Sequence, residues 1–568
     1  MHLIGSNEIK MFPCNNFTKG NYKLVQLMLS LLFLSLNSFN LSAQIPNIIL
    51  GRPTDSSITA SIMFETEADF FLELGTESGV YTKTSATYHA TPHTPLEVEI
   101  DKLQSDKKYY YHIKFKPTSS SVFVSTAEYT FHTQRSASST FSFTIESDEH
   151  LYDKKGVRSL YEITLANQAA DEPDFMLSLG DIFGDDHEPF TISSGALDSL
   201  HKDYRPFLGK VCHSIPFYVC LGNHEGENDY YYHLNPPNNL CVWGTQWRKF
   251  YYPNPYPNSF YSGNTTIEPF GIGNPENYYA WTWGNALFVV LDVYRDQNDS
   301  SAKPGAWSWS LGLPQYTWLK NTLESSTATF KFVFAHHIRG QGRGGITNAK
   351  LFEWGGYDGQ GGTNYNFPNK RPGWAKPIHQ LFKDNGVNIF FQGHDHVFAH
   401  EIMDNVTYQS LPMAADSTYE IGMLANADAY TSDTLEGSGH LRVQVSPSCV
   451  KVEFIRAYLP ADTLDGKHHN REVAFSYTIG NCSSNGMNEM NQNELVAVFP
   501  NPAQSSISVK LNNSEMIPVL RLMSLSGQFI QETISNEMDI KDITNGIYLL
   551  EVFSEGKSST HKIIVLHD

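Results

Sequence analysis

Residues 217–225, FYVCLGNHE, contain the pattern that decides the fold: five apolar residues, a glycine and three polar side chains. Four further stretches also run from apolar residues into carboxylates or imidazoles: 141–150 (FSFTIESDEH), 175–181 (FMLSLGD), 330–337 (FKFVFAHH) and 387–396 (VNIFFQGHDH). Short apolar runs that end in turn-forming residues are typical of buried strands. The repetition predicts a set of buried strands whose carboxyl ends carry polar side chains.

Helical patterns lie between these runs. Val157, Leu160, Tyr161 and Leu165 recur at helical spacing, and a second helical stretch, with Ile378, Leu381 and Phe382, is followed by the stop signal at 385–386. Alternating strands and helices predict an α/β domain built in layers.

The polar groups at the strand ends have the chemistry of a metal site. In open α/β sheets, ligands gather outside the carboxyl ends of the strands. None of the five endings supplies a cysteine as a ligand, and mixed carboxylate, amide and imidazole groups suit iron, zinc or manganese. One carboxylate shared by two ions holds them about 3.5–4 Å apart, the spacing used for in-line displacement at phosphorus.

The five endings, in this order, resemble the calcineurin-like metallophosphoesterase superfamily, whose pattern is D-x-H, G-D, G-N-H-[DE], H and G-H-x-H. The likeness covers roughly residues 138–460. It implies a four-layer α/β/β/α domain that binds two metal ions and hydrolyses phosphoric esters. The first ion would be held by Asp148, His150, Asp181 and His396, and the second by Asp181, Asn223, His336 and His394. The resemblance places the catalytic residue His224 beside the leaving-group oxygen and makes Asp181 the bridging ligand.

With the domain that precedes it, this architecture is similar to that of purple acid phosphatases, with one departure. Those enzymes carry a tyrosine three residues after the bridging aspartate and a glycine in D-x-G, whereas this chain has Gly184 and His150. We therefore expect an enzyme of this type without the tyrosinate-to-iron colour.

The expected reaction is hydrolysis of phosphate monoesters, with a hydroxide between the two ions as the nucleophile. A phosphodiesterase or nucleotidase would use the same centre. The aromatic-rich insertion at 226–285 either stacks a nucleobase or packs as a core, and we favour the core. A different class, a cell-surface binding protein with an inert α/β domain, is disfavoured by the complete ligand set.

Other polar residues near these endings have less specific patterns. Arg339 and Arg343 follow His336 in a glycine-rich loop, and with Asn223 they are candidate substrate ligands, because guanidinium forks bind phosphate well. The alternative for the two arginines is an exposed loop. His337 is an alternative ligand to His336, which we favour.

Three other acidic features are assigned structural or surface roles. Asp292 is interpreted as a structural residue. Asp395 either orients an imidazole or is solvated. Residues 185–188 are interpreted as a surface loop rather than a third metal site.

The flanking segments predict further domains. Residues 45–135 alternate in strand-like fashion, and Leu103 with residues 107–111 looks like a tyrosine corner. This segment resembles a fibronectin type III domain. The catalytic domain is expected over 138–480, and 481–494 have the composition of a linker. Residues 495–568 are again strand-like, with FPNP at 499–502, and resemble the C-terminal sorting domain of Bacteroidetes proteins exported by the type nine secretion system.

The N-terminal residues and the composition indicate an exported protein. Lys23 precedes a mostly apolar run at 24–36 and small residues ending at Ala43, so residues 1–43 are interpreted as a leader with a signal peptide and no stable membrane span. The expected location is the outer cell surface or the medium, and the expected partners are a small phosphate ester and the secretion machinery. A net charge of −20 argues against nucleic-acid binding beyond a nucleotide substrate. Outside the leader five cysteines remain, which allow one disulfide without fixing its pairing.

Overall fold

The computed structural model describes residues 45–567 except for several short gaps. The gaps are residues 119, 153–155, 184–188, 298–304, 339–342, 360, 422–429, 431–433, 465, 483–487, 490–495, 512–516, 525–528 and 555–556. The chain divides into two compact units, Met1–Gly480 and Asn481–Asp568. The predicted leader lies outside the described residues, among which no helix is long and apolar enough to cross a membrane.

Two β-sheets form the centre of the first unit. The six-stranded sheet has the order β12 (Phe217–Val219), β11 (Phe175–Ser178), β10 (Phe141–Glu146), β25 (Gly439–Val445), β26 (Cys449–Arg456) and β27 (Val473–Gly480). The eight-stranded sheet has the order β13 (Ser262–Gly263), β14 (Tyr279–Trp283), β15 (Ala286–Val290), β18 (Phe330–Phe334), β21 (Ile389–Gln392), β23 (Val406–Ser410), β22 (Phe398–Met403) and β24 (Thr434–Leu435). The strands β10, β11 and β12 are parallel, as are β15, β18, β21 and β23.

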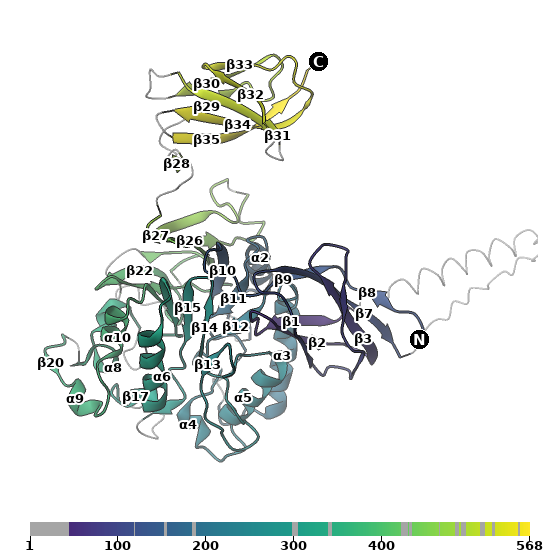
Figure 1. Cartoon of the computed structure of the whole chain (residues 1–568). Helices are drawn as coiled ribbons and strands as arrows, with labels where there is room; N and C mark the ends of the chain where they lie inside the picture. Colours follow the sequence, from purple (N-terminus) through teal and green to yellow (C-terminus); the bar gives the residue numbers. More distant parts are fainter. Residues whose placement is uncertain are drawn as a thin grey trace, which may run out of the picture. The chain divides into compact units, whose positions relative to one another are not determined.

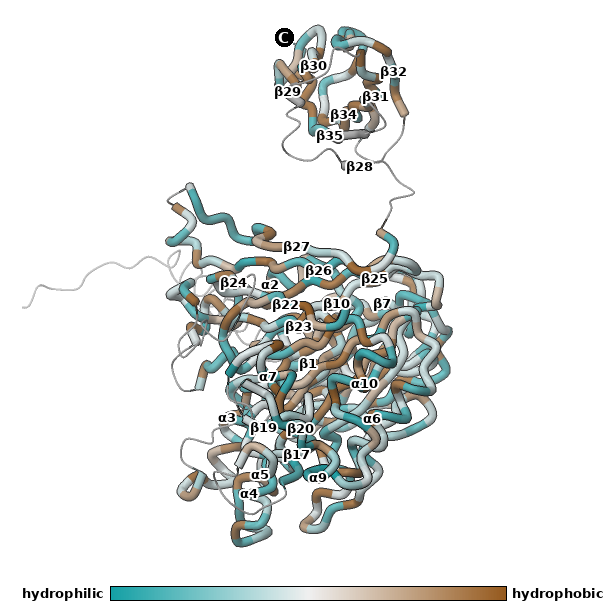
Figure 2. The backbone as a smooth tube through the Cα atoms, turned by 90° about the vertical axis from the view of Figure 1, so that its left-hand side faces the viewer, coloured by the Kyte–Doolittle hydropathy of each residue, from teal (hydrophilic) through white to brown (hydrophobic). Residues whose placement is uncertain are grey.

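Aromatic side chains fill the space between the two sheets. Phe143 stacks on Phe175 with ring centroids 5.4 Å apart and meets Phe288 of the other sheet edge-on at 5.1 Å. Figure 2 shows hydrophobic stretches along the strands in the middle of this unit. Because both faces of the central strands are covered, strands such as β11, β15 and β21 are buried along their whole length rather than on alternate residues.

Helices cover the outer faces of both sheets. α2 (Arg158–Ala169) and α3 (Ser194–Leu208) pack on the six-stranded sheet, while α6 (Gly312–Ser325) and α10 (Ile378–Asp384) pack on the eight-stranded sheet (Figure 1). The other helices are α4 (Asp229–Tyr232), α5 (Leu240–Tyr251), α7 (Ile346–Ala349), α8 (Phe352–Gly355) and α9 (Phe367–Lys370). These layers confirm the predicted α/β/β/α architecture.

The N-terminal part of the first unit is a β-sandwich. One sheet is β1 (Asn47–Gly51), β2 (Ile58–Met63) and β6 (Leu96–Ile100). The other is β4 (Lys83–Thr84), β3 (Ala68–Gly75), β7 (Lys108–Pro117) and β8 (Val124–Ser125), with β5 (Tyr88–Ala90) on β3 and β9 (Tyr129–His132) on β7. The Tyr109 hydroxyl accepts the backbone N–H of Gln104 at 2.8 Å, which is the contact expected of a tyrosine corner.

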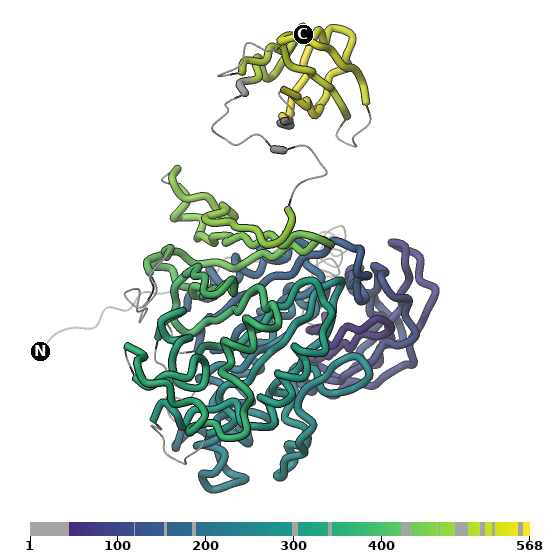
Figure 3. The backbone as a smooth tube through the Cα atoms, turned by 60° about the vertical axis from the view of Figure 1, so that its left-hand side comes forward, coloured from purple at the N-terminus to yellow at the C-terminus, as the bar shows by residue number. Residues whose placement is uncertain are grey.

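The sandwich is docked on the layered domain through buried polar contacts. Arg205 of α3 is fully buried and donates to the carbonyls of Ser61 in the sandwich, at 2.6 Å, and of Tyr251. The Tyr111 hydroxyl donates to the His213 carbonyl at 2.6 Å. Figure 3 shows the purple sandwich lying against the blue and teal part of the same unit. The sandwich is therefore part of one packed body rather than a detached spacer.

The second unit is a smaller β-sandwich. Its sheets are β28 (Asn488–Glu489), β35 (Lys557–Val565), β34 (Gly546–Ser554), β31 (Val519–Ser524) and β32 (Phe529–Ile534), and then β29 (Val496–Phe499), β30 (Ser506–Leu511) and β33 (Glu537–Asp539). A core that includes Leu520, Leu550 and Ile563 lies between them. The prediction of β-sandwiches on both flanks is confirmed.

The cysteines outside the leader divide into two classes. Cys212, Cys220 and Cys241 are free and buried, while Cys449 and Cys482 are disulfide-bonded.

Replacing Arg205 tests the docking of the sandwich. Arg205→Met removes a buried donor from each of two carbonyls, at about 1–3 kcal/mol each, and removes one desolvated charge. We expect a net loss of about 2 kcal/mol, measured as a lower urea midpoint for the full chain. Lys202→Met on the exposed side of α3 is the matched control and should change the midpoint little. Equal midpoints for the two variants would contradict the structural role of Arg205.

Candidate metal centre

The strand ends deliver their polar groups to one rim. Asp148 and His150 follow β10, Asp181 follows β11, Asn223 and His224 follow β12, His336 follows β18, and His394 and His396 follow β21. The parallel register aligns these ends, with Glu146 opposite Ser178 and Ser178 opposite Val219 in one sheet and Phe334 opposite Phe391 in the other. Three groups of side chains can each hold an ion: Asp148 with His150 and His396, His150 with Asp181 and His224, and Asp181 with His336 and His394.

The backbone at this rim takes an unusual conformation. Asp148, His150, Asp181, His394 and His396 have φ values of 57°, 48°, 60°, 65° and 56°, in the left-handed region that non-glycine residues rarely adopt. Such residues cost about 1–3 kcal/mol each and persist where the surrounding structure fixes them, often at functional sites. Here the turns carry the side chains into one shared space.

Glycines allow the strand ends to approach one another. A Cβ at Gly180, where φ is 100°, would lie 2.3 Å from the Gly222 nitrogen. A Cβ at Gly393 would lie 1.9 Å from Ser147 Oγ and 2.5 Å from Asp148 Oδ2. The glycines that precede Asp181 and His394 are therefore required by the packing of the rim.

The first group of donors surrounds Asp148. Its Oδ1 lies 3.3 Å from His396 Nε2 and 3.8 Å from His150 Nε2, and the two imidazole nitrogens are 3.1 Å apart. All three side chains are buried. Several lone pairs thus face one small volume, the arrangement that a cation would stabilise.

The second group surrounds His336. His336 Nε2 lies 3.2 Å from Asp181 Oδ2 and 3.2 Å from His394 Nδ1. Nδ1 of His336 donates to the Leu179 carbonyl at 2.8 Å, which leaves Nε2 as the ligating atom. Asp181 Oδ2 is also 3.8 Å from His150 Nε2, so this carboxylate borders both groups.

The side chain of Asn223 provides an independent test of whether these residues fit a metal ion. Its Oδ1 is buried and has no hydrogen-bond partner among the described residues. Buried polar atoms of this kind call for a partner that protein atoms do not supply. A metal ion beside Asp181 and His336 would satisfy the amide oxygen, and the set of donors fits such an ion.

The charges of the cluster are strongly coupled. Burial by itself would raise the pKa of Asp181, but the imidazoles of His336 and His224 hold it well below its usual range. Burial would lower the pKa of His336, but the Asp181 and Asp148 carboxylates raise it to about 9. Burial and the neighbouring His337 and His336 hold the pKa of His394 well below its usual range. The metal-free cluster therefore carries a proton on His336, the position that an ion would take.

His224 lies at the open side of the cluster. Its side chain is 15% exposed, and its Nε2 is 3.8 Å from Asp181 Oδ2. Asn223 and His394 are also partly exposed, while the remaining members are buried. The open side of the cluster is thus formed by His224, Asn223 and His394.

Glu225 is a site residue that the sequence analysis did not single out. Its buried carboxylate accepts the backbone N–H groups of Gly222, Asp181 and Ile182 at 2.5, 3.0 and 2.7 Å. It thereby fixes the backbone at Asp181. The sequence feature that could have identified Glu225 is its position at the end of the G-N-H-E pattern.

Two candidate side chains are engaged with the protein itself. Arg343 donates to the His394 carbonyl and lies 3.8 Å from Asp395 Oδ1. Asp395 is buried and accepts from Tyr430 and, at 2.6 Å, from the Gly344 N–H, so it anchors a loop rather than orienting an imidazole or lying in solvent. Arg339 and residues 185–188 lie outside the described residues.

Two further sequence interpretations can be placed in the structure. His337 directs Nδ1 to the Tyr294 hydroxyl at 2.9 Å, and His336, not His337, faces Asp181. Asp292 accepts from Asn277 Nδ2 at 2.6 Å and from the Tyr294 N–H at 2.8 Å, which is a structural role.

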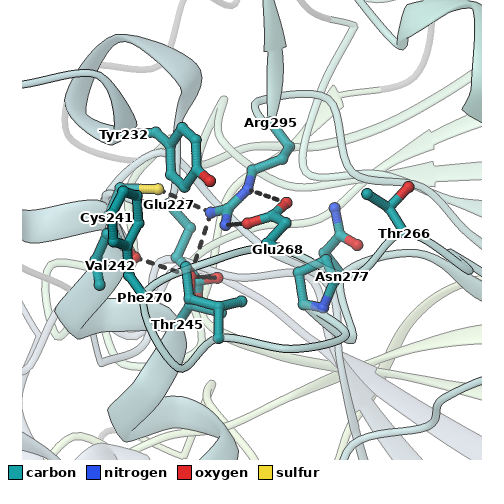
Figure 4. Close-up of polar contacts among 12 residues, drawn as sticks. Glu227, Tyr232, Cys241, Val242, Thr245, Thr266, Glu268, Phe270, Asn277 and Arg295 are labelled. Atoms are coloured by element: carbon teal, nitrogen blue, oxygen red, sulfur yellow. Dashed lines mark hydrogen bonds and ion pairs between the residues drawn. The ribbon is translucent and has the colours of Figure 1, made fainter. Parts of the chain in front are cut away.

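The insertion at 226–285 packs beside this site around buried ion pairs. Arg248 of α5 pairs with Glu227 at 2.6 Å. Arg295 pairs with Glu268, lies 2.7 Å from Cys241 Sγ and stands over the Tyr232 ring (Figure 4). Trp247 donates to Ser194 Oγ at 2.9 Å. These contacts show that part of the aromatic and polar side chains of the insertion pack against the protein itself.

Comparison with known proteins supplies the family of this site. Residues 141–398 match the family model of the calcineurin-like phosphoesterases, which spans all five strand endings. These residues form a calcineurin-like phosphoesterase domain. The chain is accordingly a metal-dependent phosphoesterase. Residues 497–566 match the secretion system C-terminal sorting domain, which indicates export by the type nine system.

Solved structures show the same fold at low identity. A structure of PhoD is 16% identical, with a TM-score of 0.54, and the match covers 76% of this chain and 90% of that one. A purple acid phosphatase from yellow lupin (Lupinus luteus) seeds is 15% identical, with a TM-score of 0.51, and the match covers 77% and 74%. No protein with a curated description matches the chain in sequence.

Metal binding to this domain should depend on pH. The pKa of His336 is raised to about 9, so an ion must displace its proton below that pH. The apparent affinity for Zn²⁺ should rise about tenfold per pH unit from about pH 7 to 9 and then level off, as measured by titration with a chelator buffer. His336→Gln should weaken binding and flatten the slope. A pH-independent affinity of the unchanged protein would contradict the assigned charge state.

Proposed function

We propose that the chain is a secreted phosphomonoesterase with a centre of two ions, drawn from iron, zinc and manganese. The first ion is assigned to Asp148, His150, Asp181 and His396, and the second to Asp181, Asn223, His336 and His394. The observation that carries this proposal is that Asp181 Oδ2 lies 3.2 Å from His336 Nε2 and 3.8 Å from His150 Nε2. A single buried carboxylate thus adjoins both groups of donors, as a bridging ligand does.

Bound ions would supply Lewis acidity at the phosphoryl oxygens and a water molecule of lowered pKa. The residues of the chain bind and orient. Asp181 is kept ionised by the imidazoles around it, and Glu225 holds its backbone through three N–H groups. The rim is therefore preorganised before substrate arrives.

His224 is proposed to protonate the departing alkoxide. It lies at the open side of the cluster, and its backbone N–H donates to Asp181 Oδ1 at 2.8 Å, which fixes its position. A positioned imidazole commonly contributes about 10²–10⁴-fold as a general acid.

Substrate contacts are proposed for Asn223, Arg339 and Arg343. Asn223 borders the open side, and Arg343 approaches the carbonyl of His394. A guanidinium has five N–H donors, so Arg343 retains others for a phosphoryl oxygen.

The remaining parts are proposed to serve export and support. Residues 1–43 would be a cleaved leader, 45–135 a fibronectin type III-like domain, 138–480 the catalytic domain, 481–494 a linker and 495–568 the sorting domain. The enzyme would act on the outer surface of a Bacteroidetes cell or in the medium.

Substitution of the shared carboxylate tests the catalytic centre. Asp181→Asn removes the charge that both ions require, so hydrolysis of p-nitrophenyl phosphate should fall about 10³-fold or more and the metal content should drop. Asp203→Asn, in an exposed pair with Arg158, is the matched control and should keep the rate. A near-unchanged rate in Asp181→Asn would rule the assignment out. Faster hydrolysis of bis(p-nitrophenyl) phosphate than of the monoester would instead identify a phosphodiesterase.

The leaving group tests His224. With His224→Gln, hydrolysis of glycerol 2-phosphate should fall about 10²–10⁴-fold, because its alkoxide needs a proton. Hydrolysis of p-nitrophenyl phosphate should fall far less, since p-nitrophenolate leaves without protonation. His233→Gln, whose side chain is 59% exposed, serves as the control. Equal losses on both substrates would exclude the proton-donor role.

A further inference from the structure

A tyrosine–histidine pair lies directly behind the second group of donors. Tyr294 follows β15 and His337 follows β18, and these strands are parallel neighbours with Val290 opposite Phe334. The Tyr294 hydroxyl is 2.9 Å from His337 Nδ1, and the two residues are only 1% and 5% exposed. Neither residue belongs to the ligand set described above.

The His337 ring lies flat against His394. Their centroids are 4.1 Å apart and their planes 29° from parallel. Among the described residues, the only side-chain hydrogen-bond contact of His394 is with His336 Nε2, the atom that faces the same cluster. His394 is also partly exposed and has a φ of 65°. The orientation of its ring therefore depends on packing.

The ring of His336, unlike that of His394, is oriented by a hydrogen bond to the backbone. Its Nδ1 donates to the Leu179 carbonyl, and such an outer hydrogen bond normally fixes the tautomer and the plane of a metal-ligating imidazole. His394 uses Nδ1 toward the cluster. The face of His337 thus restrains the plane of the His394 ring in place of an outer hydrogen bond.

The backbone at Tyr294 is held by the buried Asp292 carboxylate. Asp292 accepts the N–H groups of Tyr294 and Arg295 at 2.8 and 3.2 Å. The Arg295 side chain is anchored by Glu268 and Cys241 (Figure 4). A continuous set of contacts therefore joins the insertion to His394 through Tyr294 and His337.

We propose that Tyr294 and His337 are positioning residues that set the ring plane of His394 and so the affinity of the second metal site. This inference rests on the proposed metal centre and adds a role for the 226–285 insertion, which would tune metal retention through Arg295. No proton transfer is assigned to either residue.

Metal affinity, rather than activity, tests the pair. The probe is Co²⁺, titrated into the metal-free full chain against a competing chelator, with the visible absorption of bound Co²⁺ as a second readout. Tyr294→Phe removes one hydroxyl, His337→Phe keeps the aromatic face, and His337→Ala removes it. We expect the weaker of the two Co²⁺ affinities to fall about tenfold in Tyr294→Phe and up to about 100-fold in His337→Ala, with a changed spectrum. His337→Phe should retain more affinity than His337→Ala.

A second tyrosine–histidine pair provides the matched control. The Tyr408 hydroxyl lies 2.8 Å from His379 Nδ1 in a buried pair outside the metal centre. Tyr408→Phe removes the same hydroxyl and should leave both Co²⁺ affinities unchanged. Thermal unfolding of each metal-free variant identifies any variant that does not fold. If the His337 variants do not fold, the Co²⁺ affinity of Tyr294→Phe alone decides whether the positioning role holds.

The outcomes separate this inference from the proposed function. If the unchanged chain binds two Co²⁺ ions and Tyr294→Phe binds them equally tightly, the positioning role is refuted while the metal centre stands. If the unchanged chain binds less than one ion, the metal centre itself fails, and the positioning role with it.

Discussion

The Asp181 carboxylate, enclosed by imidazoles on both sides, is the interaction on which the rest of the structure depends. It is 1% exposed, so its charge is isolated from water and must be balanced locally. His336, His150 and His224 bring nitrogen atoms within 4 Å of it. This balance links the ends of three strands in one sheet to a strand of the other, and a cation is the natural partner for it.

The layered core makes this arrangement possible. Two sheets packed through Phe143, Phe175 and Phe288 hold the strand ends at fixed separation, and helices seal both outer faces. Rigid packing lets five residues of the rim keep a backbone conformation in the left-handed region. Each such residue costs about 1–3 kcal/mol, a strain that an isolated loop would relieve by rearranging. Glu225 and the sandwich docked at Arg205 add further restraint.

Electrostatics explain how an acidic chain accepts an anionic ester. The net charge of −20 repels phosphate at long range. Two bound cations would reverse the sign of the potential within the rim, because ions are the largest local charges in such sites. Selectivity for phosphate is thereby concentrated at the metal centre rather than spread over the surface.

The sequence by itself determined the class of the layered domain and the residue types at its strand ends. Apolar runs interrupted by helical periodicity are local patterns, and the five endings match one family over residues 141–398. The strand-like patterns of both flanking segments are also local features of the sequence. The candidate donors could be named for the same reason, since each closes its own strand.

Only the tertiary structure decided which neighbours these donors have. It turned His336 toward Asp181 and His337 toward Tyr294, 43 residues away in the chain. It gave Asp395 the role of holding Tyr430 and Gly344, and it packed the insertion around Arg295 and Glu268. Such contacts depend on how two sheets and their connecting loops meet in space, and no local pattern of residues contains that information.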